Sequence, residues 1–531
     1  MNEYTYDPSL LSSCANHAIT NEYHADCKEL FDQHQSHYQR TSSSSTHEGG
    51  RYVQFIENAM FVHGHNAQNR LHTVALNHFS DLMQDELPLY DTVGDQIHED
   101  MNVVDIQNMQ DIATAVDMLS RRSKTHKNRR HRHHARKKRR KKERQSQHLH
   151  HNRSDAAADY PLPFPKGKKR HRTYVLQHSQ QSQSNHRHNA TIEFKTDPKG
   201  NDWSTYLNWA NGDNPDGVSL VHPPLDQGEC GSCWAFAATG TLEAIASRHV
   251  GLQVYHSIID QSSFVNETSV SHRQRAIESA QQAELHAMKY ANLSIQELVD
   301  CDTRYDQGCI GGNPVTAFQF IHKHGLVSNA DYPYVGKQKE CHKKHLNGPI
   351  VTADSWGVLK PDDEDNMEMV LRYLGPIAVG LNGNDKSFIH YKGGIFDSNI
   401  CGIRPNHAML IVGYAEDETK DGTKKYWIAR NSWGAGWGMN GYIWIKRGGG
   451  SKKSRGGVCG IAKNPSVAIG ATLINDVPMI ENLEEHPKFA STRSEALRRN
   501  DEPLSRVDRF CTSLYSHSFN RSGALCSTMA T

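Results

Sequence analysis

The sequence predicts an α+β protein in which a helix-rich part precedes a sheet-rich part. Residues 232–248 place Phe236, Leu242 and Ile245 at the spacing of one helix face. Residues 349–460 alternate apolar and polar side chains between Gly and Asn turns, which is typical of antiparallel strands. A helical unit followed by a sheet-rich unit is the pattern of α+β folds. At 531 residues the chain also exceeds what one compact core normally holds.

Composition divides the chain into five segments. These are an N-terminal segment (1–20), a helical domain (21–90), a disordered basic and His-rich linker (91–201), a domain dense in aromatic residues, Gly and Cys (202–472), and a polar tail (473–531). Within the linker, residues 105–119 show a weaker helical pattern. We therefore expect two folded units joined by a long solvated segment.

The chain is polar for a globular protein, with 36% hydrophobic residues and a mean hydropathy of −0.72. No apolar run is long enough to cross a membrane. Residues 1–20 have neither the basic start nor the apolar centre of a signal peptide, so none is visible in this N-terminus.

Residues 121–144 contain fifteen Lys or Arg and one Glu, a local charge of +14. Because the whole chain carries +1, the remainder carries −13. A solvated, protease-sensitive linker is the first interpretation of this basic tract. Contact of the precursor with anionic glycans or membranes is the second. Nucleic-acid binding is least favoured, because no aromatic residue is interleaved for base stacking.

Cys233 is the candidate nucleophile. It lies in the string Gln227-Gly-Glu-Cys-Gly-Ser-Cys-Trp234, at the predicted start of a helix. The positive end of a helix dipole stabilises a thiolate, and a neighbouring imidazolium lowers the thiol pKa further. Gln227 can present its side-chain amide beside the Cys233 N–H as an oxyanion hole. Taken alone, Cys233 could equally be a buried structural cysteine.

His407 and Asn431 are the candidate base and its orienting partner. His407 precedes the apolar run Ala408–Val412, which predicts a buried strand that would hold the ring rigidly. Asn431 can accept a hydrogen bond from the imidazole and fix its orientation, the role that Asp has in serine-protease triads. Trp433 could cover that hydrogen bond and exclude water. Each string alone could be an ordinary strand or turn; the three together indicate a nucleophile, a base and an orienting group.

With its order Cys, His, Asn, the chain resembles the papain family of cysteine peptidases, and within it the cathepsin L-like members. The strings 293–302, 308–312 and 433–442 also match. The resemblance implies a two-lobe fold, with a helical lobe and an antiparallel β-barrel-like lobe, preceded by a helical inhibitory propeptide. It implies no cofactor and no metal, protein and peptide substrates, the propeptide as inhibitor, and a mature monomer.

Eleven cysteines are present, of which Cys14, Cys27, Cys511 and Cys526 lie outside the 202–472 domain. Removing Cys233 leaves six in the domain, which alone would allow fifteen pairings. The resemblance implies the pairs Cys230–Cys309, Cys301–Cys341 and Cys401–Cys459. Disulfides and five glycosylation triplets favour a lysosomal, vacuolar or secreted location.

The propeptide is indicated by a helical motif. Its members are Arg51, Phe55, Asn58, Val62 and Asn66, with Val at a position where the family has Ile. The acidic residue expected four positions before Arg51 is His47, which leaves the partner of Arg51 open. A plain helical hairpin is the alternative to an inhibitory domain.

The resemblance also locates the substrate groove. Gly311 and Gly312 would offer backbone hydrogen bonds to an extended substrate, with Trp433 nearby. The second specificity pocket would be lined by Pro314, Gly380, Ala408 and Asn464, which predicts a preference for bulky apolar or aromatic residues two positions before the cut. Residues 254–291 are an insertion, helical over 273–291. Because no His-His loop precedes His407, endopeptidase action is preferred.

These features predict a zymogen that hydrolyses peptide bonds through a thioester and is activated by propeptide removal at acid pH. A catalytically dead homologue would need a broken triad. A nucleic-acid-binding protein would rest on the basic tract alone.

Overall fold

The computed structural model describes residues 5–18, 25–39, 45–68, 70–90, 103–120, 203–262, 270–342, 351–419, 422–448 and 456–473. All of them belong to one compact unit. Residues 91–102, residues 121–202 with the basic tract, and the tail from residue 474 lie outside the described residues.

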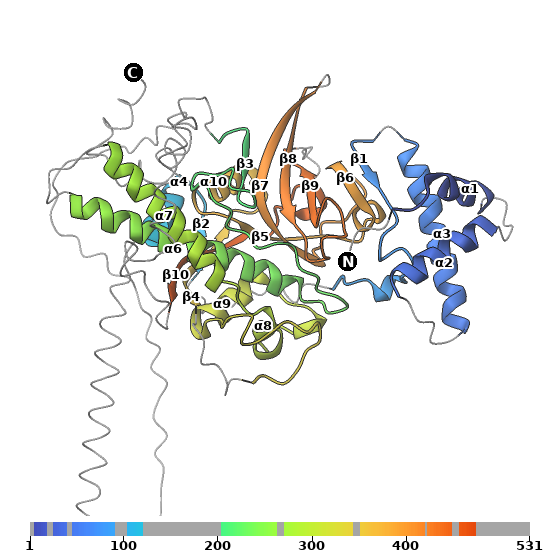
Figure 1. The fold of residues 1–531 in the computed structure, drawn as a ribbon, viewed down its shortest axis with the longest axis horizontal. Coiled ribbons are helices and arrows are strands. Elements are labelled where there is room, and N and C mark those ends of the chain that lie inside the picture. The colour runs from blue at the N-terminus through green and yellow to red at the C-terminus, as the bar shows by residue number, and fades with distance from the viewer. Residues whose placement is uncertain are drawn as a thin grey trace, which may run out of the picture. The chain divides into compact units, whose positions relative to one another are not determined.

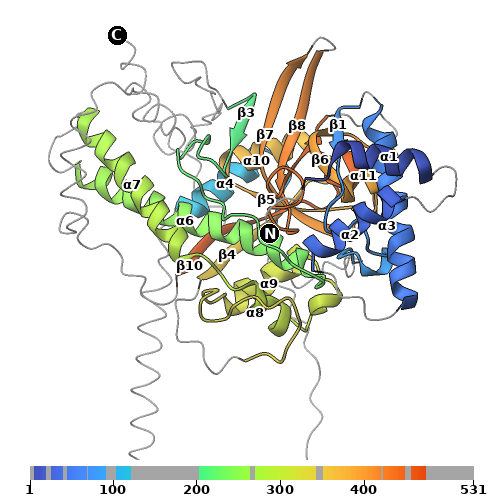
Figure 2. The ribbon, with the colours of Figure 1, turned by 45° about the vertical axis from the view of Figure 1, so that its right-hand side comes forward.

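The N-terminal part is a small helical domain with its own core. It contains α1 (Pro8–Ala18), α2 (Ala25–His37) and α3 (Ser45–Asn66), followed by β1 (His72–Val74) and the 3-10 turn η1 (Gln84–Glu86). In both ribbon views the three helices gather into one group (Figures 1 and 2). The core includes Cys14 and Cys27, which form a disulfide, and Phe55 and Val62 of α3. The boundary predicted at residue 21 is therefore wrong, because α1 packs into this domain.

The larger domain has a helical side. Its long helix α6 (Cys233–Ser262) packs against α7 (Val270–Tyr290), α8 (Ile295–Cys301) and α9 (Pro314–His324). Asn313 caps α9 by accepting from Val315 N, and Ser294 caps α8 by accepting from Glu297 N. Two further helices, α10 (Glu364–Tyr373) and α11 (Lys386–Ile389), lie between strands.

The sheet-rich side is a ten-stranded sheet. Its strands from the larger domain are β3 (Tyr206–Asn208), β4 (Val351–Leu359), β5 (Ile377–Leu381), β6 (Tyr391–Phe396), β7 (His407–Thr419), β8 (Gly422–Arg430), β9 (Tyr442–Lys446) and β10 (Ser466–Leu473). The order is β1-β6-β9-β8-β7-β5-β10-β4-β2, where β2 is Val103–Ile106 and β3 lies beside β7. Most pairs are antiparallel, as predicted; β6–β9 and β2–β4 are parallel. The α+β prediction, with a helical N-terminal domain, is confirmed.

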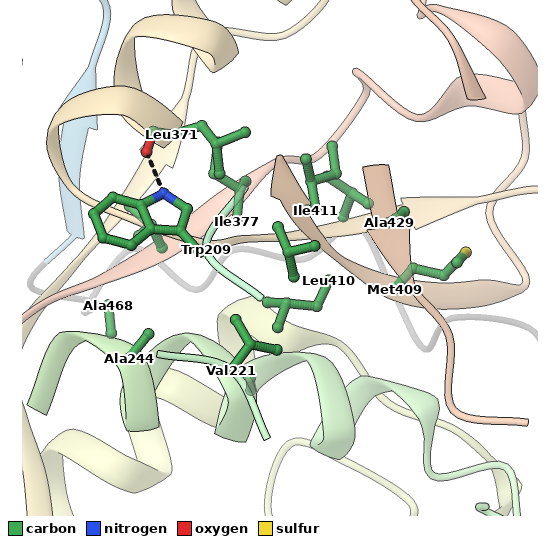
Figure 3. Close-up of a cluster of buried hydrophobic side chains, with 14 of the residues drawn as sticks. Trp209, Val221, Ala244, Leu371, Ile377, Met409, Leu410, Ile411, Ala429 and Ala468 are labelled. Carbon is green, nitrogen blue, oxygen red and sulfur yellow. Dashed lines mark hydrogen bonds between the residues drawn. The ribbon is translucent and has the colours of Figure 1, made fainter. Parts of the chain in front are cut away.

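One hydrophobic core joins α6 to the sheet. Ala244 of α6 lies beside Ala468 of β10, and Leu410 and Ile411 of β7 belong to the same core (Figure 3). Trp209 is fully buried there, and its indole N–H donates to Leu371 O at 2.9 Å. Its backbone N–H donates to Val412 O, which ties the start of the domain to β7.

The predicted end of the first helix, at residue 248, is wrong. Helix α6 continues fourteen residues further and forms a hairpin with α7, which buries Leu252 and Tyr255. Gly251 permits the close approach, because a Cβ there would lie 2.3 Å from Glu284 Oε1 of α7. The helical prediction for residues 273–291 agrees with α7.

The prediction that residues 91–201 form a disordered linker is wrong for residues 103–120. These residues form β2 (Val103–Ile106) and α4 (Met109–Ser120), both packed on the larger domain. Ile106, Ile112, Ala115 and Leu119 are buried in the core of that domain. The helical pattern at 105–119 therefore reflects a docked helix.

Three disulfides join the larger domain: Cys230–Cys309, Cys301–Cys341 and Cys401–Cys459. These are the pairs that the resemblance implied. Among the residues described, no helix is both long and apolar enough to span a membrane.

Candidate active site

Cys233 begins helix α6. Its thiol is buried, and within the described part of the chain it is the only cysteine outside a disulfide. The loop before it is fixed by the Cys230–Cys309 bridge and by a hydrogen bond from Gly231 N to Cys309 O, 2.9 Å long. The thiol lies against the backbone of Ala408, the residue that follows His407.

His407 begins β7, and Asn431 directly follows β8, the neighbouring strand. His407 Nε2 lies 2.7 Å from Asn431 Oδ1, and both residues are buried. The other ring nitrogen, Nδ1, has no hydrogen-bond partner among the described residues. Since Asn431 Oδ1 can only accept, Nε2 carries the proton and Nδ1 is left as the proton acceptor.

Trp433 covers this pair. Its ring lies 4.6 Å from the imidazole of His407 and 5.5 Å from the ring of Phe388, and it is 1% exposed. An aromatic lid of this kind keeps water from competing for the hydrogen bond between His407 and Asn431.

Gln227 is held at both ends of its amide. The NH2 group donates to Cys230 O at 2.9 Å, and Oε1 accepts from Ser432 Oγ at 2.5 Å. The same NH2 group reaches the carbonyl oxygen of Pro88 at 3.5 Å. Pro88 belongs to the N-terminal domain, so a peptide carbonyl from that domain lies at the proposed oxyanion donor.

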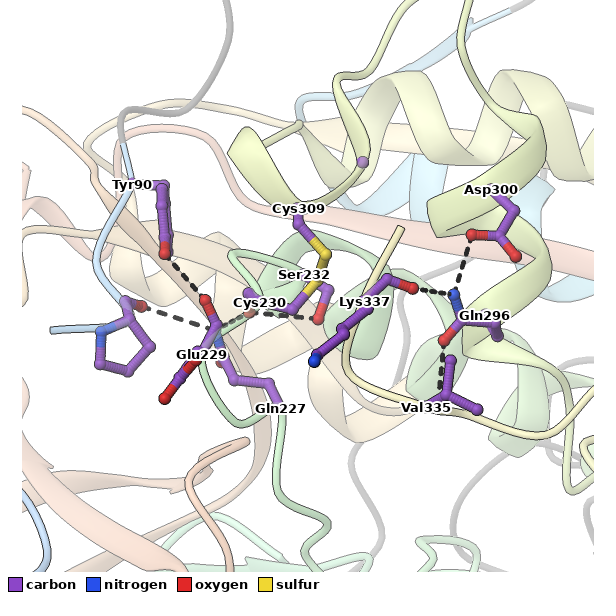
Figure 4. Close-up of a disulfide and its surroundings, with 12 residues drawn as sticks. Tyr90, Gln227, Glu229, Cys230, Ser232, Gln296, Asp300, Cys309, Val335 and Lys337 are labelled. Carbon is purple, nitrogen blue, oxygen red and sulfur yellow. Dashed lines mark hydrogen bonds between the residues drawn. A yellow bond between two sulfur atoms is a disulfide. The ribbon is translucent and has the colours of Figure 1, made fainter. Parts of the chain in front are cut away.

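The residues around Pro88 follow the groove. Tyr90 N donates to Asn406 O at 2.9 Å, and Tyr90 Oη donates to Glu229 O at 2.8 Å (Figure 4). Gly383 makes room for Leu89, because a Cβ there would lie 2.7 Å from a Leu89 methyl group. The segment Pro88–Tyr90 therefore occupies the groove beside both Gln227 and the loop before His407.

While Pro88–Tyr90 cover the site, burial has the largest effect on the pKa values of Cys233 and His407. Burial raises the pKa of the Cys233 thiol to about 11, although backbone N–H groups lower it. Burial also lowers the pKa of His407 to about 4, although the hydrogen bond with Asn431 raises it. Thiol and imidazole are both uncharged here, in contrast to the ion pair expected for an open groove.

Two parts of the chain match known protein families. Residues 204–261 and 272–469 match the family described as papain family cysteine protease, and residues 31–87 match the cathepsin propeptide inhibitor domain (I29). The chain belongs to the papain family. The gap between the two matched stretches falls where α6 ends and α7 begins, inside the predicted insertion.

Curated relatives support the assignment. Cysteine proteinase COT44 of Brassica napus is 36% identical over 250 residues, which cover 47% of this chain and 62% of the relative. A cathepsin L-like protein of Caenorhabditis elegans is 34% identical over 252 residues, covering 46% and 60%. The chain thus spans about three fifths of these relatives' length.

Solved structures support the fold. The proform of the ragweed pollen cysteine protease Amb a 11 gives a TM-score of 0.50 at 20% identity, and the match covers 90% of this chain and all of that one. Procathepsin L2 from Tenebrio molitor gives 0.50 at 21% identity, covering 83% and 99%.

The motif residues of the papain-family propeptide all have structural partners. Phe55 and Val62 fill the core of the helical domain. Asn58 Nδ2 donates to Ser80 O at 2.9 Å, and Asn66 makes two hydrogen bonds with the backbone of Val74. Arg51 pairs with Asp81 at 3.2 Å and with Glu86, which answers the question left by His47.

The predicted substrate-binding residues lie on several elements. Gly380 of β5 and Ala408 of β7 are direct partners across the sheet. Gly311 follows the 3-10 turn η2 (Gly308–Ile310), and Gly312 packs on Trp234, whose ring a Cβ would meet at 2.5 Å. Pro314 begins α9, and Asn464 is partly buried in the turn before β10.

Two residues that position Gln227 were not predicted from the sequence. Ser432 holds the amide of Gln227, and Tyr334 Oη contacts Ser232 Oγ at 2.6 Å and donates to Gln227 O at 2.8 Å. Ser432 stands between Asn431 and Trp433 in the same string, so the signal was present. Tyr334 carries no local signal, because a loop brings it to the site.

Proposed function

We propose that this chain is the zymogen of a papain-type cysteine endopeptidase. The observation that carries the proposal is a free cysteine at a helix start whose thiol lies at the backbone of Ala408, next to the buried His407–Asn431 pair. The strap Pro88–Tyr90 of the propeptide domain covers this site. The fold and the family assignment both agree with the use of these side chains in peptide-bond hydrolysis.

In the proposed mechanism the Cys233 thiolate attacks the carbonyl carbon of the scissile peptide bond. Gln227 Nε2 and the Cys233 backbone N–H donate to the oxyanion of the tetrahedral intermediate. His407 gives its proton to the leaving amine, and a thioester on Cys233 remains. His407 then takes a proton from water, whose oxygen attacks the thioester and releases the acid product and the thiol. Asn431 orients the ring throughout.

Latency has two physical causes in this proposal. Pro88–Tyr90 fill the groove, and Pro88 O occupies the position of a substrate carbonyl at Gln227. The same cover removes water from Cys233 and His407, and the dry environment favours their uncharged forms. Removal of the strap would rehydrate the pair and restore the thiolate–imidazolium form that attacks substrate.

For specificity we propose endopeptidase action with bulky apolar or aromatic residues accepted two positions before the cut. Gly380 and Ala408 lie side by side and leave the pocket roomy, and Asn464 adds a polar group. The mature form would act as a monomer. For residues 121–144 a solvated, protease-sensitive linker remains the first interpretation, and contact of the precursor with anionic glycans or membranes remains the second.

Four disulfides among the described residues favour an oxidising compartment. We propose a lysosomal, vacuolar or secreted location, which fits a protease held inactive until it leaves the site of synthesis.

A thiol-trapping epoxide tests the proposal. The activated protein should be labelled on Cys233 and should cleave peptide substrates, whereas the intact precursor should resist labelling. His407→Ala should fold but lose labelling, and Cys233→Ala should lose both. A folded protein that lacks the N-terminal domain yet neither reacts with the epoxide nor cleaves peptides would contradict the proposal.

A further inference from the structure

Residues 103–120 lie between the inhibitory domain and the larger domain in sequence, yet they pack as part of the larger one. Strand β2 adds to the free side of β4 in parallel register, from Val103 opposite Trp356 to Ile106 opposite Leu359. Lys360 N donates to Ile106 O at 3.2 Å and extends the pairing by one step. The strand thereby covers a sheet edge that would otherwise expose unpaired backbone groups.

The receiving strand is shaped for β2. Gly357 of β4 is the position where a Cβ would lie 2.4 Å from Ile106 Cδ1 and 3.1 Å from Ile469 Cδ1. A larger residue at position 357 would require Ile106 to shift, whereas Gly leaves room for this side chain, which is 0% exposed. A glycine inside a strand is unfavourable unless another group approaches closely, and here Ile106 is that group.

Helix α4 completes the attachment. Asn108 caps it by accepting from Gln110 N at 2.9 Å. Ile112, Ala115 and Leu119 then face the core and are 2%, 0% and 0% exposed. They pack against β10, α10 and α6 of the larger domain.

A buried polar contact fixes the end of the helix. His249 of α6 donates from Nδ1 to Leu119 O, 2.6 Å away, and its Nε2 lies 2.5 Å from Gln253 Nε2. With Nδ1 protonated, Nε2 can accept from the Gln253 amide, so the neutral ring satisfies both contacts. Without α4, His249 would lose the acceptor for a buried donor, which is costly.

The inhibitory domain is attached differently. Its helices bury their apolar residues in a separate core, built around Phe31, Phe55 and Val62. By contrast, the apolar residues of 103–120 belong to the main core of the larger domain. The inhibitory domain does contact the main core through Phe79 and Leu87, and its β1 pairs with β6. Its helices nevertheless keep a core of their own, whereas the buried apolar residues of 103–120 have none apart from the main core.

We infer that residues 103–120 are a structural part of the mature protease and stay bound to it when the inhibitory domain is removed, including when the linker after residue 120 is also cut. The inference rests on the proposed function only in that it concerns maturation. The surface formed by β4, β10 and α6 is then a docking site for this segment of the chain itself.

The test uses the full chain with Cys233→Ala, so that no self-cleavage occurs. Recognition sequences for a site-specific viral protease replace residues 93–99 and 181–187, and both are cut. Gel filtration at high salt, which screens the charge of the basic tract, then separates bound from released fragments. The fragment that contains 103–120 should elute with the larger domain in equal amounts, as measured by mass spectrometry.

A matched pair of variants identifies the contact. Leu119→Asp places a charge at a fully buried position and should reduce co-elution at least about tenfold. Met118→Asp, at the adjacent position that is 38% exposed, should leave it unchanged. If the fragment containing 103–120 is released from the protein that has neither substitution, the inference is wrong, whether or not Leu119→Asp folds. The inference is also wrong if the fragment is retained equally with Leu119→Asp. Because the variant is inactive by design, neither result depends on protease activity.

Discussion

A fall in pH should loosen the inhibitory domain through His72, which lies in β1 against β6. The ring is 4% exposed, packs 5.1 Å from Phe396 and 6.4 Å from Tyr391, and leaves Nε2 without a hydrogen-bond partner among the described residues. Its charged neighbours are His65 and Arg70 of its own domain, and Asp385 and Asp397 of the larger one. Burial lowers the pKa of His72 from 6.5 to about 4.

The direction of the pH effect on docking follows from the state in which His72 binds a proton more readily. The docked state holds His72 neutral, whereas a released β1 lets it protonate near 6.5, so docking is fully favoured above pH 6.5 and weakens as pH falls towards 4. Between pH 7 and pH 5 the loss is about 1.8 kcal/mol, or roughly 20-fold in the docking equilibrium. Burial also lowers the pKa of His65 and lowers that of His390 to about 3, and both act in the same direction.

Hydrogen exchange measures this directly in the Cys233→Ala protein. Two amides report docking: Ala75 N donates to His390 O at 2.8 Å, and Ile395 N donates to Leu71 O at 2.9 Å. After correction for intrinsic exchange, their protection should fall at least about 20-fold from pH 7 to pH 5.

His72→Phe keeps an aromatic ring beside Phe396 and cannot be protonated, so it should remove that part of the pH dependence. The partly exposed His63 of α3 provides the control, because His63→Phe should leave the dependence intact. If protection is flat between pH 7 and pH 5, or if His72→Phe retains the full slope, the reasoning about buried His72 is wrong.

Three further predictions concern catalysis and latency. Gln227→Ala should lower kcat of the activated enzyme by about 10²–10³-fold, with a smaller effect on KM, because one oxyanion donor is lost; a change confined to KM would argue for a binding role alone. Asn431→Ala should lower kcat roughly 10- to 100-fold and should flatten the pH profile, since the loss of one hydrogen bond to a charged imidazole is worth about 1.5–3 kcal/mol; an unchanged profile would show that the ring needs no orienting partner. Replacing both Cys14 and Cys27 by Ser opens a loop of 13 residues and should destabilise the inhibitory domain by about 3 kcal/mol, so thermal unfolding of that domain should shift down and activation should be faster than in the parent protein; identical activation rates would place the disulfide outside the release step.

The catalytic residues could be predicted because each lies in a contiguous string whose local structure follows from the sequence. Cys233 starts a helix, His407 starts a buried strand, and Asn431 directly follows the neighbouring strand. Pairing of β7 with β8 then brings the last two together without any further information.

The errors arose where tertiary contacts decide local structure. Gly251 weakens a helix by propensity alone, yet here it allows α7 to approach α6, so the helix continues. Strand β2 has only four residues, and its stability comes from Gly357, some 250 positions later in the sequence. Nothing in residues 103–120 themselves indicates that partner, and the polar segments on either side favour a linker.

Helix α4 ends at Ser120, and Arg121 is the first residue of the stretch that carries +14. An enzyme that keeps α4 anchored keeps the beginning of this cationic stretch tethered to its own surface. The position of the cut after Ser120 then determines how many of the basic residues remain attached to the active protease. Maturation would in that way determine both when the enzyme becomes active and how tightly it binds polyanions such as sulfated glycans. The affinity for polyanions would fall steeply as the salt concentration rises.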